Sequence, residues 1–275
     1  MKILVFGGSG FLGSEIIKIL KQKKLGFLAP SSQKADVLTL QMENLVRSYQ
    51  PDFILNCVAF TAVDNAEAEV ERAYALNAEV PKRLAQVAHE VGARLVHFST
   101  DFVFDGRQES GYTESDLPKP LSVYGKSKRQ GEKNIQEVDG KYWIIRTSFP
   151  FGDDPKCFLQ KILTQIESGR DLKVVDGFVC SPTAFAELAE RVVEMLPENL
   201  ESGIYHLTNF GACSRYEFAR EVLRILKRKN KIEPTAVLQT GTTAERPLHS
   251  ALLNTKLPEM KPWTTALANY LKSKI

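Results

Sequence analysis

Short apolar runs alternate with longer amphipathic segments through the first half of the 275-residue chain. The predicted strands are residues 2–6, 25–29, 53–59, 94–100 and 142–148. The predicted helices are residues 14–24, 39–50 and 66–91, with one more that begins near Tyr124. Strands that are apolar along nearly their whole length are typical of a parallel sheet covered by helices on both faces. The pattern therefore predicts an α/β fold built on a doubly wound parallel sheet.

The rhythm of the pattern changes after about residue 149. Helical patterns near residues 155–168, 184–196 and 215–228 are separated by short strands and by Gly and Pro turns such as "CSPT" and "KIEPTAV". We therefore expect residues 1–148 to form the sheet domain. Residues 149–275 should mainly form a smaller α/β lobe that binds substrate, with some segments returning to the first domain. Because ligands bind at the carboxyl ends of the strands in such sheets, a lobe above that edge would close a cleft.

Composition narrows the class of protein. Hydrophobic residues make up 43% of the chain and charged residues 25%, which is ordinary for a globular protein. No apolar run is long enough to span a membrane, and the start, "MKILVFGGSG", predicts a first strand rather than a signal peptide. A net charge of +3 suits a small anionic ligand but is too weak to indicate nucleic-acid binding. The four Cys and four His show no metal-site spacing, so we expect no bound metal, reduced thiols and a cytoplasmic location.

Three glycines, Gly7, Gly10 and Gly13, lie between the first predicted strand and the first predicted helix. In a dinucleotide-binding turn the first glycine allows the tight turn and the second lets the backbone approach a diphosphate. The third lets helix and strand pack closely, and the helix N-terminus faces the phosphates. Because these glycines stand where that mechanism needs them, they favour a Rossmann-type domain that binds NAD(P) over a turn with no ligand.

The segment after the second predicted strand bears on the choice between NADP and NAD. Enzymes that use NAD usually carry a carboxylate there for the ribose 2′-hydroxyl, but no acidic residue lies between Leu25 and Lys34. Ser31 would not repel a 2′-phosphate and Lys34 could attract one. We therefore expect NADP(H) to be preferred, with NAD(H) as the alternative. Asp36, followed by Val37, either reaches the adenine or starts the next helix.

A hydroxyl cluster and a Tyr–Lys pair are the strongest candidates for catalysis. Thr100 and Asp101 lie where a predicted strand ends, at the edge where a substrate would bind. Tyr124 and Lys128 lie at the start of the next helix with the i,i+4 spacing that puts two side chains on one face. Together these residues indicate a site for hydride transfer to or from a carbonyl group.

Reduction of a ketone explains these residue types. Negative charge builds on the carbonyl oxygen during hydride transfer, so a proton donor must be in place. A free Tyr has a pKa near 10, and a cation close by lowers it. We therefore expect Tyr124 to donate the proton, and Lys128 to lower the pKa of Tyr124 and to bond the cofactor ribose. Thr100 can donate a hydrogen bond to the carbonyl oxygen.

A second Tyr–Lys pair, Tyr270 and Lys274, has the same spacing. No hydroxyl cluster at a strand end precedes it, and it lies on the last amphipathic pattern of the chain. We interpret this second pair as coincidence.

Eight segments carry a resemblance to a known family: residues 56–69, 76–85, 97–106, 124–132, 145–152, 179–189, 203–207 and 245–257. They resemble, in order and spacing, the dTDP-4-dehydrorhamnose reductase family of the extended short-chain dehydrogenase/reductase superfamily. The resemblance implies reduction of the 4-keto group of a dTDP-deoxysugar by NAD(P)H, most simply dTDP-4-dehydro-L-rhamnose, for polysaccharide biosynthesis. It also implies a homodimer in many members and Mg²⁺ at the dimer contact in some. No acidic cluster decides either point here.

The resemblance also implies a set of ligand contacts. The implied cofactor contacts are Gly10, Phe11, Leu12, Ala59, Phe60 and Thr61, and the implied sugar contacts are Thr61, Val63, Thr100, Asp101 and Phe149. Of these, Val63 and Phe149 are apolar and would fit a hydrophobic core equally well.

Two departures from the family pattern leave the sugar open. The family usually has Tyr where this chain has Phe102, and often has Trp where this chain has Phe149. Other reductases of UDP- or GDP-4-keto sugars therefore remain alternatives. A dehydratase would carry Glu in place of Phe102 and is disfavoured. A non-catalytic NADP-binding regulatory subunit is a further alternative, against which the intact Tyr124 and Lys128 argue.

Two arginines are candidate partners for a substrate diphosphate, because the guanidinium fork suits phosphate oxygens. Arg246 lies in a loop-like segment of the second lobe and is the better candidate. Arg146 lies in a predicted strand and fits a structural ion pair as well. His206 follows a short strand pattern and is interpreted as a core or edge histidine, while His249 has no assigned role.

Overall fold

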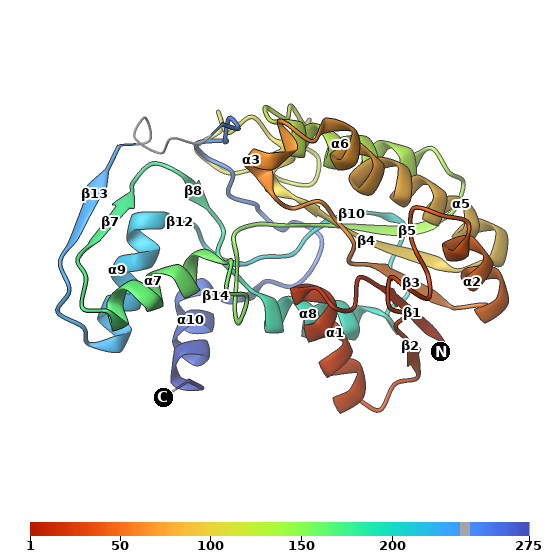
Figure 1. Ribbon diagram of the computed structural model, residues 1–275, viewed down its shortest axis with the longest axis horizontal. Coiled ribbons are helices and arrows are strands. Elements are labelled where there is room, and N and C mark those ends of the chain that lie inside the picture. The colour runs from red at the N-terminus through yellow and green to blue at the C-terminus, as the bar shows by residue number, and fades with distance from the viewer. Residues whose placement is uncertain (237–242, 275) are drawn as a thin grey trace.

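The computed structural model describes residues 1–236 and 243–274, and Figure 1 shows two lobes side by side with a parallel sheet in the larger one. Within these two ranges no helix combines the length and the apolar character needed to cross a membrane. The two lobes meet at the carboxyl ends of the strands, where the sequence predicts the site.

Six parallel strands form the central sheet, in the order β10-β5-β4-β3-β1-β2. Their bounds are Gly203–His206 (β10), Lys141–Thr147 (β5), Arg94–Thr100 (β4), Phe53–Asn56 (β3), Ile3–Phe6 (β1) and Phe27–Leu28 (β2). Strands β4 and β5 pair along their whole length, so that Thr100 lies beside Thr147 at the carboxyl edge. The predicted parallel sheet is confirmed.

Helices cover both faces of this sheet (Figure 1). One face packs against α2 (Gln41–Tyr49), α5 (Val80–Val91) and α6 (Val123–Gln136), and the other against α1 (Phe11–Gln22) and α8 (Phe185–Met195). The strands are buried from both sides, which explains why they read as continuous apolar runs.

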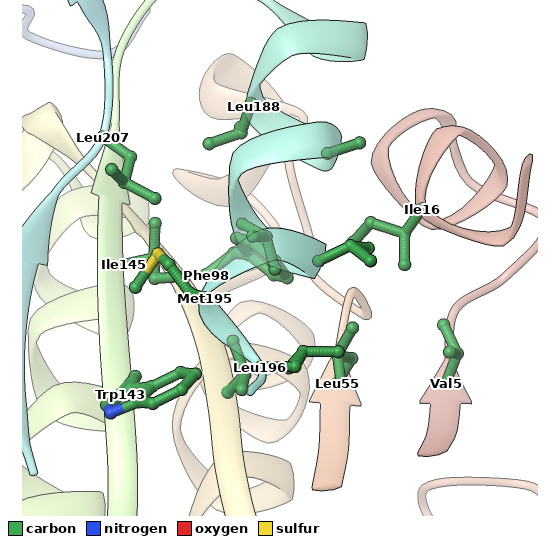
Figure 2. Close-up of a cluster of buried hydrophobic side chains, with 14 of the residues drawn as sticks. Val5, Ile16, Leu55, Phe98, Trp143, Ile145, Leu188, Met195, Leu196 and Leu207 are labelled. Atoms are coloured by element: carbon green, nitrogen blue, oxygen red, sulfur yellow. The ribbon is translucent and has the colours of Figure 1, made fainter. Parts of the chain in front are cut away.

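Two elements of the second half of the chain belong to the core of the sheet. Figure 2 shows Leu188, Met195 and Leu196, from α8 and the turn after it, facing Trp143 and Ile145 of β5. Strand β10 extends the sheet by pairing with β5. The larger lobe is therefore completed by residues that follow the change in sequence pattern near residue 149.

The smaller lobe is built from three helices and short strand pairs. Its helices are α7 (Phe158–Glu167), α9 (Arg215–Leu226) and α10 (Trp263–Lys272), and its core centres on Phe218. Its strand pairs are β6 (Pro150–Phe151) with β9 (Thr183–Ala184), β7 (Leu172–Val175) with β13 (Ile232–Thr235), β8 (Val179–Cys180) with β12 (Cys213–Ser214), and β11 (Asn209–Phe210) with β14 (Met260–Pro262).

The predicted helix 66–91 is wrong as a single element. The chain instead forms α3 (Val63–Ala66), α4 (Val70–Tyr74), a π-helix over Ala75–Glu79 and then α5. The N–H of Val80 bonds to the carbonyl of Ala75, five residues back, and the next residue, Pro81, has no N–H to give. The missing donor at Pro81 is the local reason why the helix widens here.

The segment "KIEPTAV" also differs from the prediction, which was a turn. Residues Ile232–Thr235 form the strand β13, with Pro234 opposite Val174. A proline is tolerated there because β13 pairs on one side only, so the other side needs no N–H donor.

Candidate active site

The glycine turn between β1 and α1 has the geometry of a phosphate-binding loop. Gly7 has φ +77°, and a Cβ on it would lie 2.7 Å from the backbone carbon of Cys57. A Cβ on Gly13 would lie 2.2 Å from the carbonyl oxygen of Gly7, so only glycine lets α1 approach the turn this closely. The N-cap Gly10 offers no side chain, so the first N–H groups of α1 have no side-chain cap. These observations fit a cofactor diphosphate at this helix N-terminus.

Tyr124 and Lys128 lie in the first two turns of α6, which begins after the N-cap Ser122. The Ser122 hydroxyl accepts a 3.2 Å hydrogen bond from the N–H of Gly125. A Cβ on Gly125 would lie 2.2 Å from the carbonyl oxygen of Phe102, so glycine lets the helix start directly against the segment after β4. Helix α6 thus presents Tyr124 next to the end of β4.

The pKa of Tyr124 differs from the expectation. Burial raises it to about 12, while a hydrogen bond with the Thr100 side chain lowers it and the charge of Asp101 raises it further. The prediction of a lowered pKa is therefore wrong for the protein alone: burial dominates, and Lys128 is not among the groups that shift the pKa of Tyr124. The phenol stays protonated at neutral pH.

Lys128 is buried and directed at the backbone of β4. Its ammonium donates a 2.5 Å hydrogen bond to the carbonyl oxygen of Phe98. Burial lowers the pKa of Lys128 to about 8, and the carboxylate of Glu132 opposes that shift. The ammonium is therefore close to its titration point near physiological pH.

Asp101 ties three distant segments together at the end of β4. Its carboxylate accepts hydrogen bonds from the hydroxyls of Thr100 (3.0 Å), Ser148 (2.8 Å) and Ser250 (2.6 Å). Burial raises the pKa of Asp101, and the three hydroxyls act against that shift. Both carboxylate oxygens are thus engaged inside the protein, whereas the resemblance implies a contact with the sugar.

Asn77, which the sequence did not single out, connects the loop after β3 with α6. Its side-chain oxygen accepts a 2.9 Å hydrogen bond from the N–H of Phe60, and its amide donates to the carbonyl of Phe60 (3.1 Å) and to the hydroxyl of Ser127 (3.0 Å). Ser127 in turn donates to the carbonyl of Tyr124. In the sequence, the only local feature that could have drawn attention to Asn77 is Pro81, which follows it by one helical turn.

The other predicted cofactor contacts lie around the glycine turn. Ala59, Phe60 and Thr61 follow β3, whose last bond to the neighbouring strand joins the N–H of Cys57 to the carbonyl of Phe6. Phe11 and Leu12 begin α1. Ser31 is exposed after β2, and Val37 is half-buried. The carboxylate of Asp36 accepts a 2.9 Å bond from the N–H of Leu38, in the turn that precedes α2.

The predicted sugar contacts lie on both lobes. Thr61 is exposed, and Val63 begins α3 on the larger lobe. Phe149 has φ +40°, a strained value for a residue with a side chain. Its ring packs against Phe158 and Phe218 with ring centres 5.6 and 5.1 Å away.

Arg246 is bound to a carboxylate of the opposite lobe. Its guanidinium makes two hydrogen bonds to Asp64 of α3, at 2.7 and 3.1 Å, and this pairing lowers the pKa of Asp64. The N–H of Ala244 donates to the same carboxylate at 3.0 Å. The pair joins α3 to the segment that follows the undescribed residues 237–242.

Arg146 and His206 are structural. Arg146 is 1% exposed and makes two 2.8 Å bonds to Glu132, which also accepts from Ser99 at 2.6 Å. The ring of His206 is buried and bonds to the carbonyl of Leu253 at 3.0 Å. The interpretations of a structural ion pair and a core histidine are confirmed. The backbone of His249 forms an isolated β-bridge with that of Val179.

The cysteines and possible metal ligands are dispersed. Cys57, Cys157, Cys180 and Cys213 are all free thiols. Among residues 1–236 and 243–274, no three His, Cys, Asp or Glu side chains group in a way that could hold a metal ion.

Comparisons with known proteins agree with this geometry. The family model described as RmlD substrate binding domain matches residues 1–275. The spore coat polysaccharide biosynthesis protein SpsK of Bacillus subtilis is 34% identical, over 99% of this chain and 98% of SpsK. A dTDP-4-dehydrorhamnose reductase of Streptomyces griseus is 34% identical over 96% of this chain and 91% of the relative. The crystal structure of dTDP-4-dehydrorhamnose reductase from Bacillus anthracis in complex with NADP superposes with a TM-score of 0.94, at 29% identity and 99% coverage of both chains.

Proposed function

Because the chain belongs to the RmlD substrate binding domain family and is an NAD(P)H oxidoreductase, we propose that it reduces the 4-keto group of dTDP-4-dehydro-L-rhamnose. The observation that carries the proposal is the meeting of Thr100, Tyr124 and Lys128 at the carboxyl edge of the sheet, beside the glycine turn. The relatives named as dTDP-4-dehydrorhamnose reductases, aligned over nearly the whole chain, support the choice of substrate.

Tyr124 is the proposed proton donor. Bound NAD(P)H would supply the hydride to the carbonyl carbon. A pKa of about 12 keeps Tyr124 protonated at neutral pH, which is the state that reduction requires. The alkoxide formed from a ketone is a stronger base than a phenolate, so proton transfer from Tyr124 is downhill even with its raised pKa.

Lys128 and Thr100 support this step from two sides. The Lys128 ammonium has further N–H donors beyond the one it gives to Phe98, and one of these would bond the cofactor ribose. Its charge also stabilises the phenolate that Tyr124 becomes after the transfer. The Thr100 hydroxyl, already in contact with Tyr124, donates its single proton to Asp101 in the free protein. With substrate bound, this proton would turn to the carbonyl oxygen where negative charge develops.

The cofactor would bind across the edge of the sheet. The uncapped N-terminus of α1 and the glycine turn would hold its diphosphate, and Ala59, Phe60 and Thr61 would line its nicotinamide side. The bonds from Asn77 to Phe60 keep this loop in place.

We propose a preference for NADP(H) over NAD(H). The support is the exposed Ser31 after β2, the absence of a carboxylate between Leu25 and Lys34, and the positive charge of Lys34 nearby. The Bacillus anthracis relative, whose crystal structure contains NADP, points the same way. Asp36 and Val37 would then border the adenine.

The sugar would lie between the two lobes. Thr61 and Val63 would contact it from the larger lobe, Phe149 would pack against it from the smaller one, and Arg246 would bind the diphosphate. Asp101 would hold Thr100 through the 3.0 Å bond until the sugar binds, while its other oxygen stays bonded to Ser148 and Ser250.

The test is consumption of NADPH and NADH, followed separately, with dTDP-4-dehydro-L-rhamnose generated in place from dTDP-glucose. We expect NADPH oxidation that depends on the sugar, with NADH slower. UDP- and GDP-linked 4-keto sugars serve as the competing substrates. Turnover with one of these alone would contradict the dTDP assignment, and NADPH binding without turnover of any keto sugar would favour a regulatory subunit.

Assembly and metal dependence belong to the same proposal. Members of this family commonly form homodimers, so we propose a homodimer, to be measured by light scattering with and without Mg²⁺. EDTA treatment during the turnover assay decides whether a metal contributes.

A further inference from the structure

Arg215 is a half-buried cation with unusual surroundings. It is the first residue of α9, and its guanidinium lies 5.8 Å from the ring centre of Phe158 and 5.5 Å from that of Phe178. Both distances are within the range of cation–π attraction. Among residues 1–236 and 243–274, the guanidinium has neither a hydrogen-bond acceptor nor an ion-pair partner. Its N–H groups are therefore not used by the described part of the protein.

A comparison with Arg146 shows why this is unexpected. Arg146 is fully buried, and the Nε and Nη2 groups of its guanidinium both bond to Glu132. A buried cation normally has such a partner, because removing charge and donors from water without compensation is costly. The two phenyl rings hold the flat face of Arg215 but cannot accept its in-plane N–H groups.

Arg215 belongs to a small group of charges at the cleft. Burial lowers the pKa of Arg215, the like charge of Arg246 lowers it further, and the carboxylates of Asp101 and Asp64 raise it. Asp64 is already paired with Arg246, and Asp101 already accepts from three hydroxyls. The N–H of Val179, next to Phe178, donates a 2.7 Å hydrogen bond to the carbonyl of Leu248, so the segment that carries Arg246 runs beside the ring that Arg215 contacts. Both nearby carboxylates already have partners within the protein.

We infer that Arg215 and Arg246 together bind the diphosphate of the nucleotide-sugar substrate, an inference that rests on the proposed function. A diphosphate offers adjacent anionic groups, and a guanidinium fork matches phosphate oxygens in a bidentate way. The rings of Phe158 and Phe178 hold the guanidinium of Arg215, and Asp64 holds the guanidinium of Arg246. Asp101 follows the catalytic Thr100 directly, so a diphosphate near Arg215 leaves the attached sugar in reach of Tyr124.

The experiment compares Arg215→Met with wild type in direct binding of dTDP and dTMP by calorimetry. Methionine keeps an apolar chain against the two rings and removes the charge. We expect dTDP to bind about ten- to a hundredfold more weakly, as for the loss of a charged hydrogen-bonding group. The ratio of dTDP to dTMP affinity should fall, because a single phosphate needs only one fork. NADPH affinity should not change.

The matched control is Arg220→Met, which replaces an exposed arginine on the same helix. This variant should bind dTDP as wild type does.

Three results would count against the inference. Unchanged dTDP affinity in Arg215→Met would overturn it while reductase turnover still supports the proposed function. Equal weakening for dTDP and dTMP would assign Arg215 a structural role only. A wild-type protein that binds none of dTDP, UDP and GDP, yet reduces another ketone, would remove both proposals. If Arg215→Met does not fold, Arg215→Lys replaces it: a charge without the fork should bind dTDP several-fold more weakly, and wild-type affinity would overturn the inference.

Discussion

The amide of Asn77 donates a 3.0 Å hydrogen bond to the hydroxyl of Ser127 and so joins the π-helix to α6, the helix that carries Tyr124. The same amide donates to the carbonyl of Phe60, and Ser127 donates to the carbonyl of Tyr124. A single buried side chain thus sets the loop after β3 and the backbone of Tyr124 relative to each other.

Replacing Tyr124 by Phe should reduce turnover by about 10²-fold or more, because the proton donor is lost. The affinity for NADPH should stay near that of wild type, measured by fluorescence titration. Tyr270→Phe is the matched control, since it removes a hydroxyl that bonds to Asp153 and Gln160 in the smaller lobe. If Tyr124→Phe keeps most of the activity, or Tyr270→Phe is the damaging change, the assignment of the catalytic pair is wrong.

The pKa of Lys128 predicts two opposite pH effects. The value kcat/KM for NADPH should fall above about pH 8, because the ammonium that bonds the ribose loses its proton. The free energy of unfolding should instead increase as the pH rises. Between about pH 8 and pH 10.5 the folded protein has lost this proton while the unfolded chain still holds it, so the free energy of unfolding gains from rising pH.

The control for both effects is Lys128→Met, which cannot titrate. Urea unfolding at several pH values should show the stability advantage of Lys128→Met over wild type shrinking as the pH rises from 8 to 10.5. A constant difference across this range would show that the Lys128 pKa is not lowered by burial.

Gly131→Ala should separate α6 from the π-helix. A Cβ on Gly131 would lie 2.1 Å from the backbone oxygen of Asn77, and backbone cannot move aside cheaply. We expect a loss of stability of about 1–3 kcal/mol, as for overpacking, together with lower activity. Gly140→Ala is the control, because a Cβ there meets its nearest atom at 3.5 Å. Equal thermal stability of the two variants would show that this contact can relax.

Arg146→Met should be among the most destabilising single changes, at about 3–5 kcal/mol, because it leaves Glu132 buried without its main cation. The double variant Glu132→Leu/Arg146→Met should recover part of this loss in urea unfolding, since the fully buried carboxylate is removed together with its buried cation. Arg129, which also pairs with Glu132, is partly exposed and can be solvated. Arg191→Met, which breaks a partly exposed pair with Glu198, should cost about 1 kcal/mol or less. A double variant no better than the single one would mean that the charge at Glu132 is not what destabilises the fold.

Lys34→Glu should shift cofactor preference. Reversing this charge next to a 2′-phosphate is expected to raise the KM for NADPH roughly tenfold, while the KM for NADH changes little. Lys21→Glu, an exposed lysine at the end of α1, controls for the change in net charge. If the affinity for both cofactors falls equally, Lys34 does not bind the 2′-phosphate.

Sequence pattern was sufficient for the elements whose signal is local. Strand β4 begins and ends at the predicted residues 94–100, because burial on both faces makes its whole length apolar. The glycine turn and the pair Tyr124 and Lys128 were also readable, since their chemistry depends on spacing within one turn or helix. The carboxyl-edge rule then placed Thr100 near them before any contact was known.

Tertiary structure alone decided which charges meet and what their environment is. Asn77 lies fifty positions from Ser127, and Arg246 lies far along the chain from Asp64, so no periodicity relates either pair. The pKa of Tyr124 rises although Lys128 is one turn away, because desolvation depends on every element packed around the phenol. Periodicity and spacing record which way a backbone turns, whereas burial and pairing arise only when distant segments pack together.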